Sequence, residues 1–215
     1  MMKLFKKFIG FLFPAHCVTC RLKGYWICSA CLADILPAKA AEYNWIISVW
    51  NYKDPRIKRL LWKFKFENKF SIIEDLGASL YDHLSDELAE RALFDNLKSP
   101  ILVPIPLSRK SLRKRGYNQS KILAQELADR SNGFLQVQDI LQKNKDTATQ
   151  HSIKNRRERL RNLQGMFEIK NTADIKGKNI VLIDDITTTH GTLLEAKRVL
   201  RANGAKKILG FTIAH

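Results

Sequence analysis

The stretch LIDDITTTHGT, from Leu182 to Thr192, constrains the fold of this chain more than any other part of the sequence. It completes an apolar run over 180–183 and precedes a stretch over 193–202 whose apolar residues recur at helical spacing. A second apolar run covers 208–213. Buried strands separated by a polar loop and a helix are typical of a parallel sheet covered by helices. The sequence therefore predicts an α/β fold with a central, mainly parallel sheet flanked by helices.

The same stretch predicts a ligand site at the end of the first of these strands. Asp184 and Asp185 end the strand, and residues 187–192 lead into the N-terminus of the helix. Backbone N–H groups and the positive end of the helix dipole favour a phosphate there, and the threonine hydroxyls add uncharged donors. The two carboxylates can accept hydrogen bonds from the diol of a ribose. One phosphorylated sugar fits the whole arrangement, although a hydroxyl-capped turn would account for the loop alone.

The charge of the chain favours anionic partners. Its 215 residues include 37 Lys+Arg against 21 Asp+Glu, which gives a formal net charge of +16. Such a field attracts nucleic acid, phosphate ligands or an acidic membrane surface. No apolar run approaches the roughly 18 residues that a membrane-spanning helix needs. At this length we expect one domain with a small appendage.

All four cysteines lie in one short segment, CVTCRLKGYWICSAC. They form two Cys-x-x-Cys pairs, Cys17 with Cys20 and Cys28 with Cys31, separated by seven residues. Each pair can turn two thiolates toward one ion, and two pairs complete the closed tetrahedral site that structural zinc prefers. Two disulfides are the alternative, which a reducing cytoplasm disfavours. A closed four-sulfur site leaves no open position, so we expect the zinc to be structural.

Residues 1–40 are expected to form an N-terminal module, with a basic helix and the zinc site, and residues 41–215 the main domain. The module begins with MMKLFKKFIGFLF, in which Leu4, Phe5 and Phe8 share one helical face with lysines at its border. Two interpretations remain open: a helix docked on its own protein, or an interfacial helix at the cytoplasmic face of the inner membrane. No signal-peptide cleavage site follows, so we expect a cytoplasmic protein, peripheral to that membrane under the second interpretation.

The middle of the chain is expected to alternate strands and helices. Strands are predicted within 45–52 and over 101–106, where β-branched and apolar residues gather and turn signals follow. Helices are predicted over 56–70, opened by an Asp-Pro pair, and over 72–84, followed by a polar stretch. A further helix is expected from residue 118 onward.

Three basic stretches supply more positive charge than one small ligand needs. In the helix expected over 56–70, lysines interleave with aromatic residues such as Trp62, a pattern that can bind phosphates and stack the bases of a single strand. An amphipathic helix with buried aromatics and solvated lysines explains the same pattern. The second stretch, 109–115, is expected to be a strand-to-helix loop, where ligands bind in open α/β sheets. The third stretch covers 156–161. The residues expected to bind DNA are Lys63, Lys65, Arg156, Arg157, Arg159 and Arg161.

Taken together, these motifs resemble those of a known family. The stretch 182–192 is similar to the signature with which type I phosphoribosyltransferases bind phosphoribosyl pyrophosphate (PRPP). More specifically, the chain resembles the ComF family of competence proteins over nearly its full length. The resemblance rests on the double Cys-x-x-Cys module and on the stretches YKDPRIKRLLWKFKF, VPIPLSRKSLRKRGYNQS, TATQHSIKNRRERLRN and VLIDDITTTHGT, in that order.

The resemblance implies a type I phosphoribosyltransferase fold, PRPP with magnesium as ligand, and a part in natural transformation. In that role the protein would handle incoming single-stranded DNA in the cytosol, together with other DNA-uptake or recombination proteins. Asp184 and Asp185 are the implied catalytic acids, which hold the ribose hydroxyls. The implied contacts of the 5-phosphate are Thr188, Thr189, His190, Gly191 and Thr192, and those of the pyrophosphate are Arg113 and Arg115. Thr147, Gln150, Arg159 and Asn162 match a family pattern whose role does not follow from the residues.

Two features leave the activity open. His190 stands where the signature has glycine, so it either adopts a left-handed backbone conformation and offers its ring to the phosphate, or narrows the pocket. Purine-salvage relatives carry an acid where this chain has Thr188, and no other base for an acceptor stands out. Three functions therefore remain: a PRPP-binding protein that handles single-stranded DNA, an active phosphoribosyltransferase with an unidentified nucleobase or amine acceptor, and a zinc-stapled adaptor with a vestigial pocket.

Overall fold

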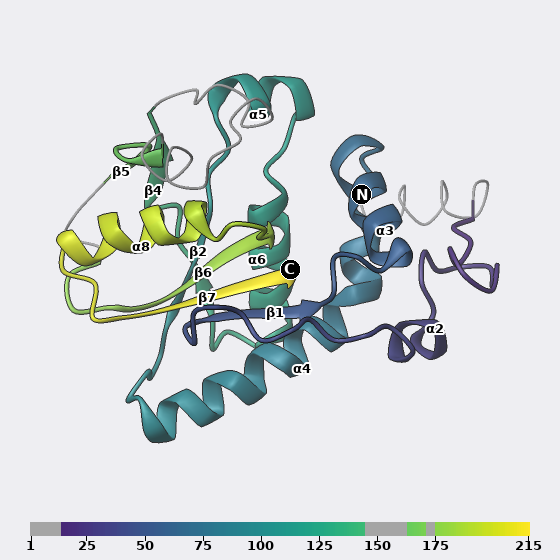
Figure 1. Cartoon of the computed structure of the whole chain (residues 1–215), viewed down its shortest axis with the longest axis horizontal. Coiled ribbons are helices and arrows are strands. Elements are labelled where there is room, and N and C mark those ends of the chain that lie inside the picture. Colours follow the sequence, from purple (N-terminus) through teal and green to yellow (C-terminus); the bar gives the residue numbers. More distant parts are fainter. Residues whose placement is uncertain (1–13, 145–162, 171–174) are drawn as a thin grey trace.

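A five-stranded parallel sheet forms the centre of the computed structural model, which describes residues 14–144, 163–170 and 175–215. The strands are β1 (Ile46–Trp50), β7 (Lys207–Ala214), β6 (Asn179–Ile186), β2 (Ile101–Pro104) and β3 (Gln136–Val137), in that spatial order (Figure 1). Every neighbouring pair is parallel. The predicted parallel sheet is therefore confirmed. A short antiparallel ribbon, β4 (Leu141–Lys143) with β5 (Phe167–Ile169), stands beside it.

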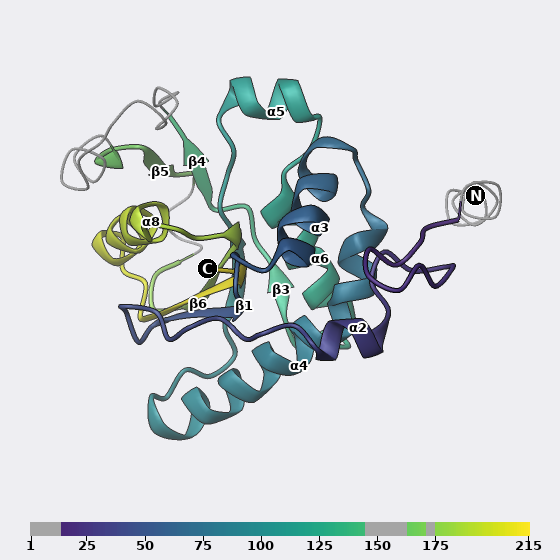
Figure 2. The same ribbon diagram turned by 45° about the vertical axis from the view of Figure 1, so that its right-hand side comes forward.

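Helices cover both faces of the sheet, which explains why its central strands are apolar along their length. On one face, α8 (Gly191–Ala202) packs against alternate residues of β6, such as Ile180 and Leu182. On the other face, Val181 and Ile183 contact the core formed with α3 (Pro55–Phe66), α4 (Ser71–Phe94) and α6 (Gln119–Arg130). Figure 2 shows α8 on one side of the strands and α3 and α6 on the other. Successive strand residues point to opposite faces, so burial on both faces requires a continuous apolar run.

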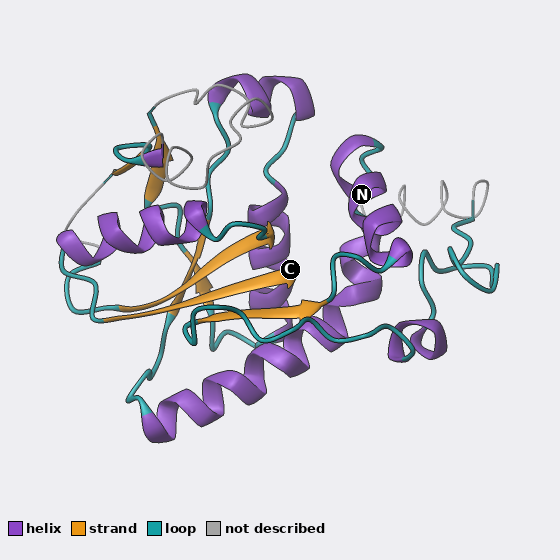
Figure 3. Cartoon of the chain, in the orientation of Figure 1, coloured by secondary structure: helices purple, strands orange, loops and turns teal. Residues whose placement is uncertain are grey.

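The described N-terminal residues, 14–45, are mostly loop, with α2 (Ser29–Ala33) as one short helix (Figure 3). Their buried side chains, including Ile27 and Leu32, belong to the same apolar core as Trp50 and Leu76. The cysteine segment is therefore fixed against the main sheet and α4. The proposed boundary at residue 40 stays a prediction, and the expected N-terminal helix lies largely outside the described residues.

Several expected boundaries were wrong. The helix predicted over 56–70 ends at Phe66, and the strand predicted over 101–106 ends at Pro104. The helix predicted over 72–84 continues as α4 to Phe94, because Leu84 and Leu88 extend its buried face while the polar residues lie on its other faces. The cations expected in a loop form a short helix instead, α5 (Arg109–Arg115). Ser108 caps that helix by accepting a hydrogen bond from the Ser111 N–H at 3.2 Å.

Candidate functional site

The four cysteines come together as the spacing predicts. The sulfur atoms of Cys17, Cys20, Cys28 and Cys31 all lie within 4.8 Å of one another. A tetrahedral zinc ion with Zn–S bonds of about 2.3 Å would place its sulfurs about 3.8 Å apart. Cys20 Sγ and Cys28 Sγ are separated by 3.6 Å, so the cluster has the dimensions of such a site. The donor set is also the one that structural zinc prefers, and these residues could hold the ion with no position left for a substrate.

The thiols of the cluster differ in how readily they ionise, as the pKa values of Cys17 and Cys31 show. Burial raises the pKa of Cys17, but backbone N–H groups of Cys28, Cys20 and Thr19 bring it down to about 6. The pKa of Cys31 rises to about 12, chiefly through its hydrogen bond with Cys28 and also through burial. Four adjacent thiolates repel one another, and a divalent cation is the group that would let all of them ionise.

The two predicted acids lie at the carboxyl end of β6, in the middle of the sheet. Asp184 Oδ1 accepts a hydrogen bond from the Ser120 hydroxyl at 3.0 Å and another from the Asp185 N–H at 2.9 Å. Asp185 Oδ1 accepts from the Ile186 N–H at 2.9 Å, and its Oδ2 lies 2.8 Å from Nζ of Lys65. The strand includes both acids, so their backbone is held by neighbouring strands. On β7, Thr212 pairs with Asp184 and Ala214 with Ile186, so the strand ladder continues through the acid pair.

The surroundings of Asp184 raise its pKa. Burial, and after it the negative charge of Asp185, raise the pKa of Asp184 to about 7, although Lys65 and the Ser120 hydroxyl act in the opposite direction. A hydroxyl that donates to the ionised carboxylate would relieve this cost, because hydrogen bonding to the charged form stabilises it. The pair thus has the electrostatic character of a polar ligand site and differs from a surface acid cluster.

The threonine loop connects β6 to α8 as the sequence predicts. Thr187 is buried and its N–H donates to the Ala214 carbonyl at 3.1 Å, whereas Thr188 is exposed and Thr189 is partly exposed. The helix begins at Gly191, two residues earlier than expected, with Thr192 in its first turn. The loop therefore places threonine hydroxyls and helical N–H groups at one end of α8, beside the acid pair. This is a geometry that can bind a phosphate.

His190 adopts the left-handed backbone conformation that the sequence raised as one alternative. Its φ is 59°, and it occupies the N-cap position of α8. The residue as a whole is only 4% exposed. Its ring packs edge-on to Tyr43, with ring centroids 5.6 Å apart, and lies 4.6 Å from the ring of His215. The imidazole is therefore held within the protein core beside the loop.

The two arginines predicted to contact a pyrophosphate lie on α5. Arg113 is exposed, and Arg115 donates to Oε1 of Gln119 at 3.2 Å. The guanidinium of Arg115 also lies 5.6 Å from the ring centre of Phe66, in a cation–π arrangement. Arg115 thus contacts the last residue of α3 and the first residue of α6.

Two lysines of α3 contact different parts of the protein. Nζ of Lys63 lies 2.9 Å from Oε2 of Glu67 and 5.3 Å from the ring centre of Trp26, on the side of the cysteine module. Nζ of Lys65 lies 2.8 Å from Oδ2 of Asp185, and its expected contact with DNA stays a prediction. Residues two apart on a helix point in different directions, which explains the difference. The arginines expected to bind DNA, 156–161, lie outside the described residues, as do Thr147, Gln150 and Asn162.

Some aromatic residues of α3 are buried, as in an amphipathic helix, and others are exposed, as stacking with bases requires. Phe64 is fully buried, whereas Trp62 and Phe66 are each 54% exposed, with ring centroids 5.8 Å apart. They border a cavity of about 480 Å³, which we call the aromatic cleft. The residues that line it include Tyr52, Lys58, Trp62, Lys65, Phe66 and Ile186. The cleft thus reaches from the exposed face of α3 to the residue that follows the acid pair.

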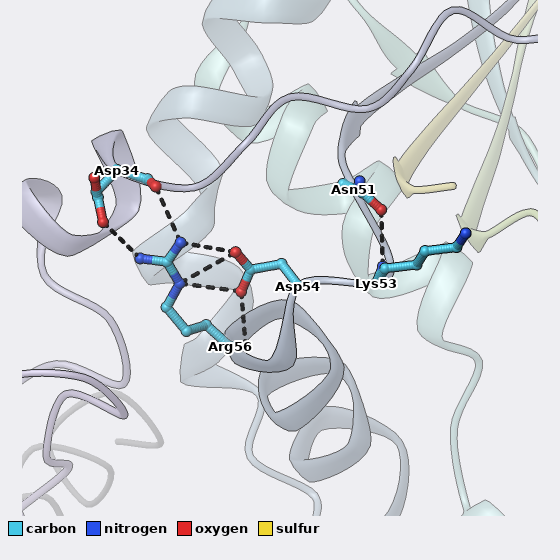
Figure 4. A network of polar contacts seen from close by, with 5 residues as sticks. All are labelled: Asp34, Asn51, Lys53, Asp54 and Arg56. Atoms are coloured by element: carbon cyan, nitrogen blue, oxygen red, sulfur yellow. Dashed lines mark hydrogen bonds and ion pairs between the residues drawn. The ribbon is translucent and has the colours of Figure 1, made fainter.

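A polar network fixes the start of α3 (Figure 4). Asp54 caps the helix, and its Oδ1 accepts a hydrogen bond from the Arg56 N–H at 2.8 Å. The Arg56 guanidinium donates to Asp54 Oδ2 at 2.7 Å and to Asp34 Oδ2 at 3.0 Å. Asp34 follows α2 of the cysteine module, so the network ties that module to α3. Reasoning from sequence missed this link and the Lys65, Ser120 and Tyr43 contacts, because no local pattern identifies partners far apart in the chain.

Comparisons with known proteins place these features in context. The sequence model of the phosphoribosyl transferase domain matches residues 77–214, which include the acid pair and the threonine loop. Competence protein F of Haemophilus influenzae is 32% identical over 209 residues, which cover 94% of this chain and 84% of that protein. DNA utilization protein YhgH of Escherichia coli is 28% identical over 225 residues, which cover 91% of this chain and 94% of that protein. Competence protein ComFC of Bacillus subtilis is 33% identical over 167 residues, which cover 77% of this chain and 62% of that protein.

Proposed function

Because this chain belongs to the ComF family of phosphoribosyltransferase-like competence proteins, we propose that it binds PRPP with Mg²⁺ and handles single-stranded DNA during DNA uptake. The names of its relatives refer to competence and DNA utilization, which supports the second half of this proposal. The observation that carries the first half is the placement of two carboxylates and a helix N-terminus at one end of β6.

Each part of PRPP has a chemically suited neighbour. The acid pair accepts hydrogen bonds from the ribose hydroxyls, and the loop over 187–192 binds the 5-phosphate through N–H groups and hydroxyls. The exposed Arg113 and the neighbouring Arg115 offset the charge of the pyrophosphate. A Mg²⁺ ion would reduce the charge of the pyrophosphate, whose oxygens are the kind of ligand that this hard cation prefers.

Binding of a single strand is supported by charge and by exposed rings. The net charge of +16 exceeds what one PRPP molecule neutralises. Trp62 and Phe66 offer half-exposed surfaces on which bases can stack, and Lys58 lies beside them in the cleft. We place this activity in the cytosol, with peripheral membrane contact through residues 1–13 and DNA-uptake or recombination proteins as partners. In the part of the chain that the structure describes, no helix is long and apolar enough to cross a bilayer.

Calorimetry tests the proposal directly. Titration of the purified protein with PRPP and Mg²⁺ is expected to show one site per chain. The same titration of the Asp184→Asn, Asp185→Asn double variant should show no binding at similar concentrations. A wild-type protein that binds no PRPP, or a double variant that binds it equally well, would contradict the proposal.

A second candidate, transfer of the phosphoribosyl group to an acceptor, is favoured by one observation. The aromatic cleft lies next to the acid pair, where an acceptor ring would be close to a bound sugar. Release of pyrophosphate on addition of free nucleobases or amines to the PRPP complex would establish this activity. A complex that binds PRPP and releases no pyrophosphate would instead support a binding role.

A further inference from the structure

Lys65 belongs to two neighbouring sites. It lines the aromatic cleft, and its ammonium lies 2.8 Å from Oδ2 of Asp185. The side chain of Lys65 is 19% exposed and that of Asp185 is 10% exposed, so the ion pair lies at the boundary between the core and solvent. Ile186, which follows Asp185, lines the same cleft. The acid pair and the cleft are therefore in direct contact through one cation.

A sugar at the acid pair has to compete with this cation. Asp185 Oδ1 already accepts the N–H of Ile186, and Oδ2 is the oxygen that Lys65 holds. A ribose hydroxyl that donates to Oδ2 takes over the role of the ammonium at that oxygen. A partly buried ammonium without its counter-ion is costly, so the displaced Lys65 gains from a new anionic partner.

The cleft offers the place where such a partner would lie. Trp62 and Phe66 present half-exposed rings, and the Lys58 ammonium lies 5.8 Å from the ring centre of Tyr52. Stacking surfaces interleaved with cations suit a base and its adjoining phosphate. Arg115, 5.6 Å from the ring centre of Phe66, adds a further cation at the outer edge. A nucleotide of a single strand would place its phosphate within reach of the released Lys65.

We infer that Lys65 couples the two ligands: PRPP at the acid pair releases its ammonium, which then binds a phosphate of a strand whose base occupies the aromatic cleft. This inference rests on the proposed function, because it requires both ligands to bind. Coupling of this kind is reciprocal, and each ligand raises the affinity of the other by the same factor. Typical factors are about 5-fold to 150-fold.

Fluorescence anisotropy tests the coupling. A labelled oligothymidine of about 30 nucleotides, long enough for several phosphate contacts, is titrated with protein at fixed ionic strength. The titration is run with Mg²⁺ alone, with PRPP and Mg²⁺, and with inorganic pyrophosphate and Mg²⁺. We expect PRPP to raise the affinity for the oligonucleotide about 5-fold or more. Pyrophosphate has no diol for Asp185, so it should give no increase.

Three variants assign the effect to Lys65. Lys65→Met should remove the increase caused by PRPP, whereas Lys65→Arg should retain it, because arginine can form and release the same ion pair. Lys58→Gln is the matched control in the same cleft: it should weaken DNA binding with and without PRPP by the same factor. Melting curves of all three variants establish that they are folded.

The outcomes separate the coupling from the function on which it rests. If the wild-type protein binds both ligands and PRPP leaves DNA affinity unchanged, the coupling is wrong and the proposed function stands. If Lys65→Met retains the full increase, the assignment to Lys65 is wrong. If the wild-type protein fails to bind PRPP or the oligonucleotide, the proposed function itself fails, and the coupling fails with it.

Discussion

His190 combines an unfavourable backbone conformation with a buried ring, and two substitutions separate these contributions to stability. His190→Ala removes the ring and keeps a side chain at φ 59°. His190→Gly removes the ring and also relieves the left-handed conformation, because glycine has no Cβ. The difference between the two variants therefore measures the backbone contribution, and His190→Ala compared with wild type measures the ring.

The magnitudes follow from the structure. His190 is 4% exposed and its ring packs against Tyr43 and His215. Removal of the ring is expected to cost about 2–3 kcal/mol, below the range for a buried phenylalanine, because imidazole is smaller and more polar. A left-handed non-glycine residue costs about 1 kcal/mol. His190→Gly should therefore be about 1 kcal/mol more stable than His190→Ala and still less stable than wild type. For a chain of this size, 1 kcal/mol corresponds to about 2–4 °C in melting temperature.

Urea unfolding of both variants, with melting curves alongside, provides the assay. Asn132 is the matched control, since it has φ 51° and an exposed side chain. Asn132→Gly should be close to neutral, and Asn132→Ala should lose about 1 kcal/mol. Equal stability of His190→Ala and His190→Gly would refute the left-handed assignment, and a His190→Ala variant as stable as wild type would refute the packing of the ring. In calorimetry, His190→Gly should bind PRPP at least as well as wild type; a clear loss would show that the ring contacts the ligand.

Four further outcomes are expected. Mass spectrometry and metal analysis should find one zinc per chain, and Cys28→Ser should destabilise the protein, because metal binding contributes to its folding; reduced thiols without metal would contradict the site. The Asp184→Asn, Asp185→Asn double variant should bind PRPP about 10²-fold to 10⁴-fold more weakly, since each of two lost bonds to a charged group is worth about 1.5–3 kcal/mol. The pKa of Asp184 is about 7 in the folded protein against an ordinary value of 3.8, so the free energy of unfolding should decrease as the pH rises from about 4 to 7, because the folded state keeps a proton that the unfolded state has lost. Asp184→Asn should remove that part of the pH dependence in urea unfolding. Binding to single strands should weaken with salt at a slope of about −3 to −4 for four to six phosphate contacts, and Trp62→Ala should lower affinity at every salt concentration without lowering the melting temperature, since a base stacked on its exposed ring would be lost.

Local patterns in the sequence determined much of this protein. The apolar runs around 180–183 and 208–213 predict adjacent buried strands because burial on both faces permits no polar alternation. The four cysteines predict their own cluster, since each Cys-x-x-Cys pair is a short turn that brings two sulfurs together. Asp54 and Pro55 predict the start of α3 through capping and a fixed backbone angle. The same reasoning placed Asp184 and Asp185 at a strand end beside a helix N-terminus.

Contacts between distant parts of the chain were decided by the tertiary structure alone. Lys65 looked like one cation among several on a basic helix, and only the packing of α3 against the sheet places it on Asp185. His190 was recognisable as a departure from a glycine position, but the partners of its ring, Tyr43 and His215, come from opposite ends of the main domain. Periodicity and propensity act over a few residues, whereas these pairs depend on how helices and strands pack around a shared core. Which charge neutralises which is therefore a property of the folded chain.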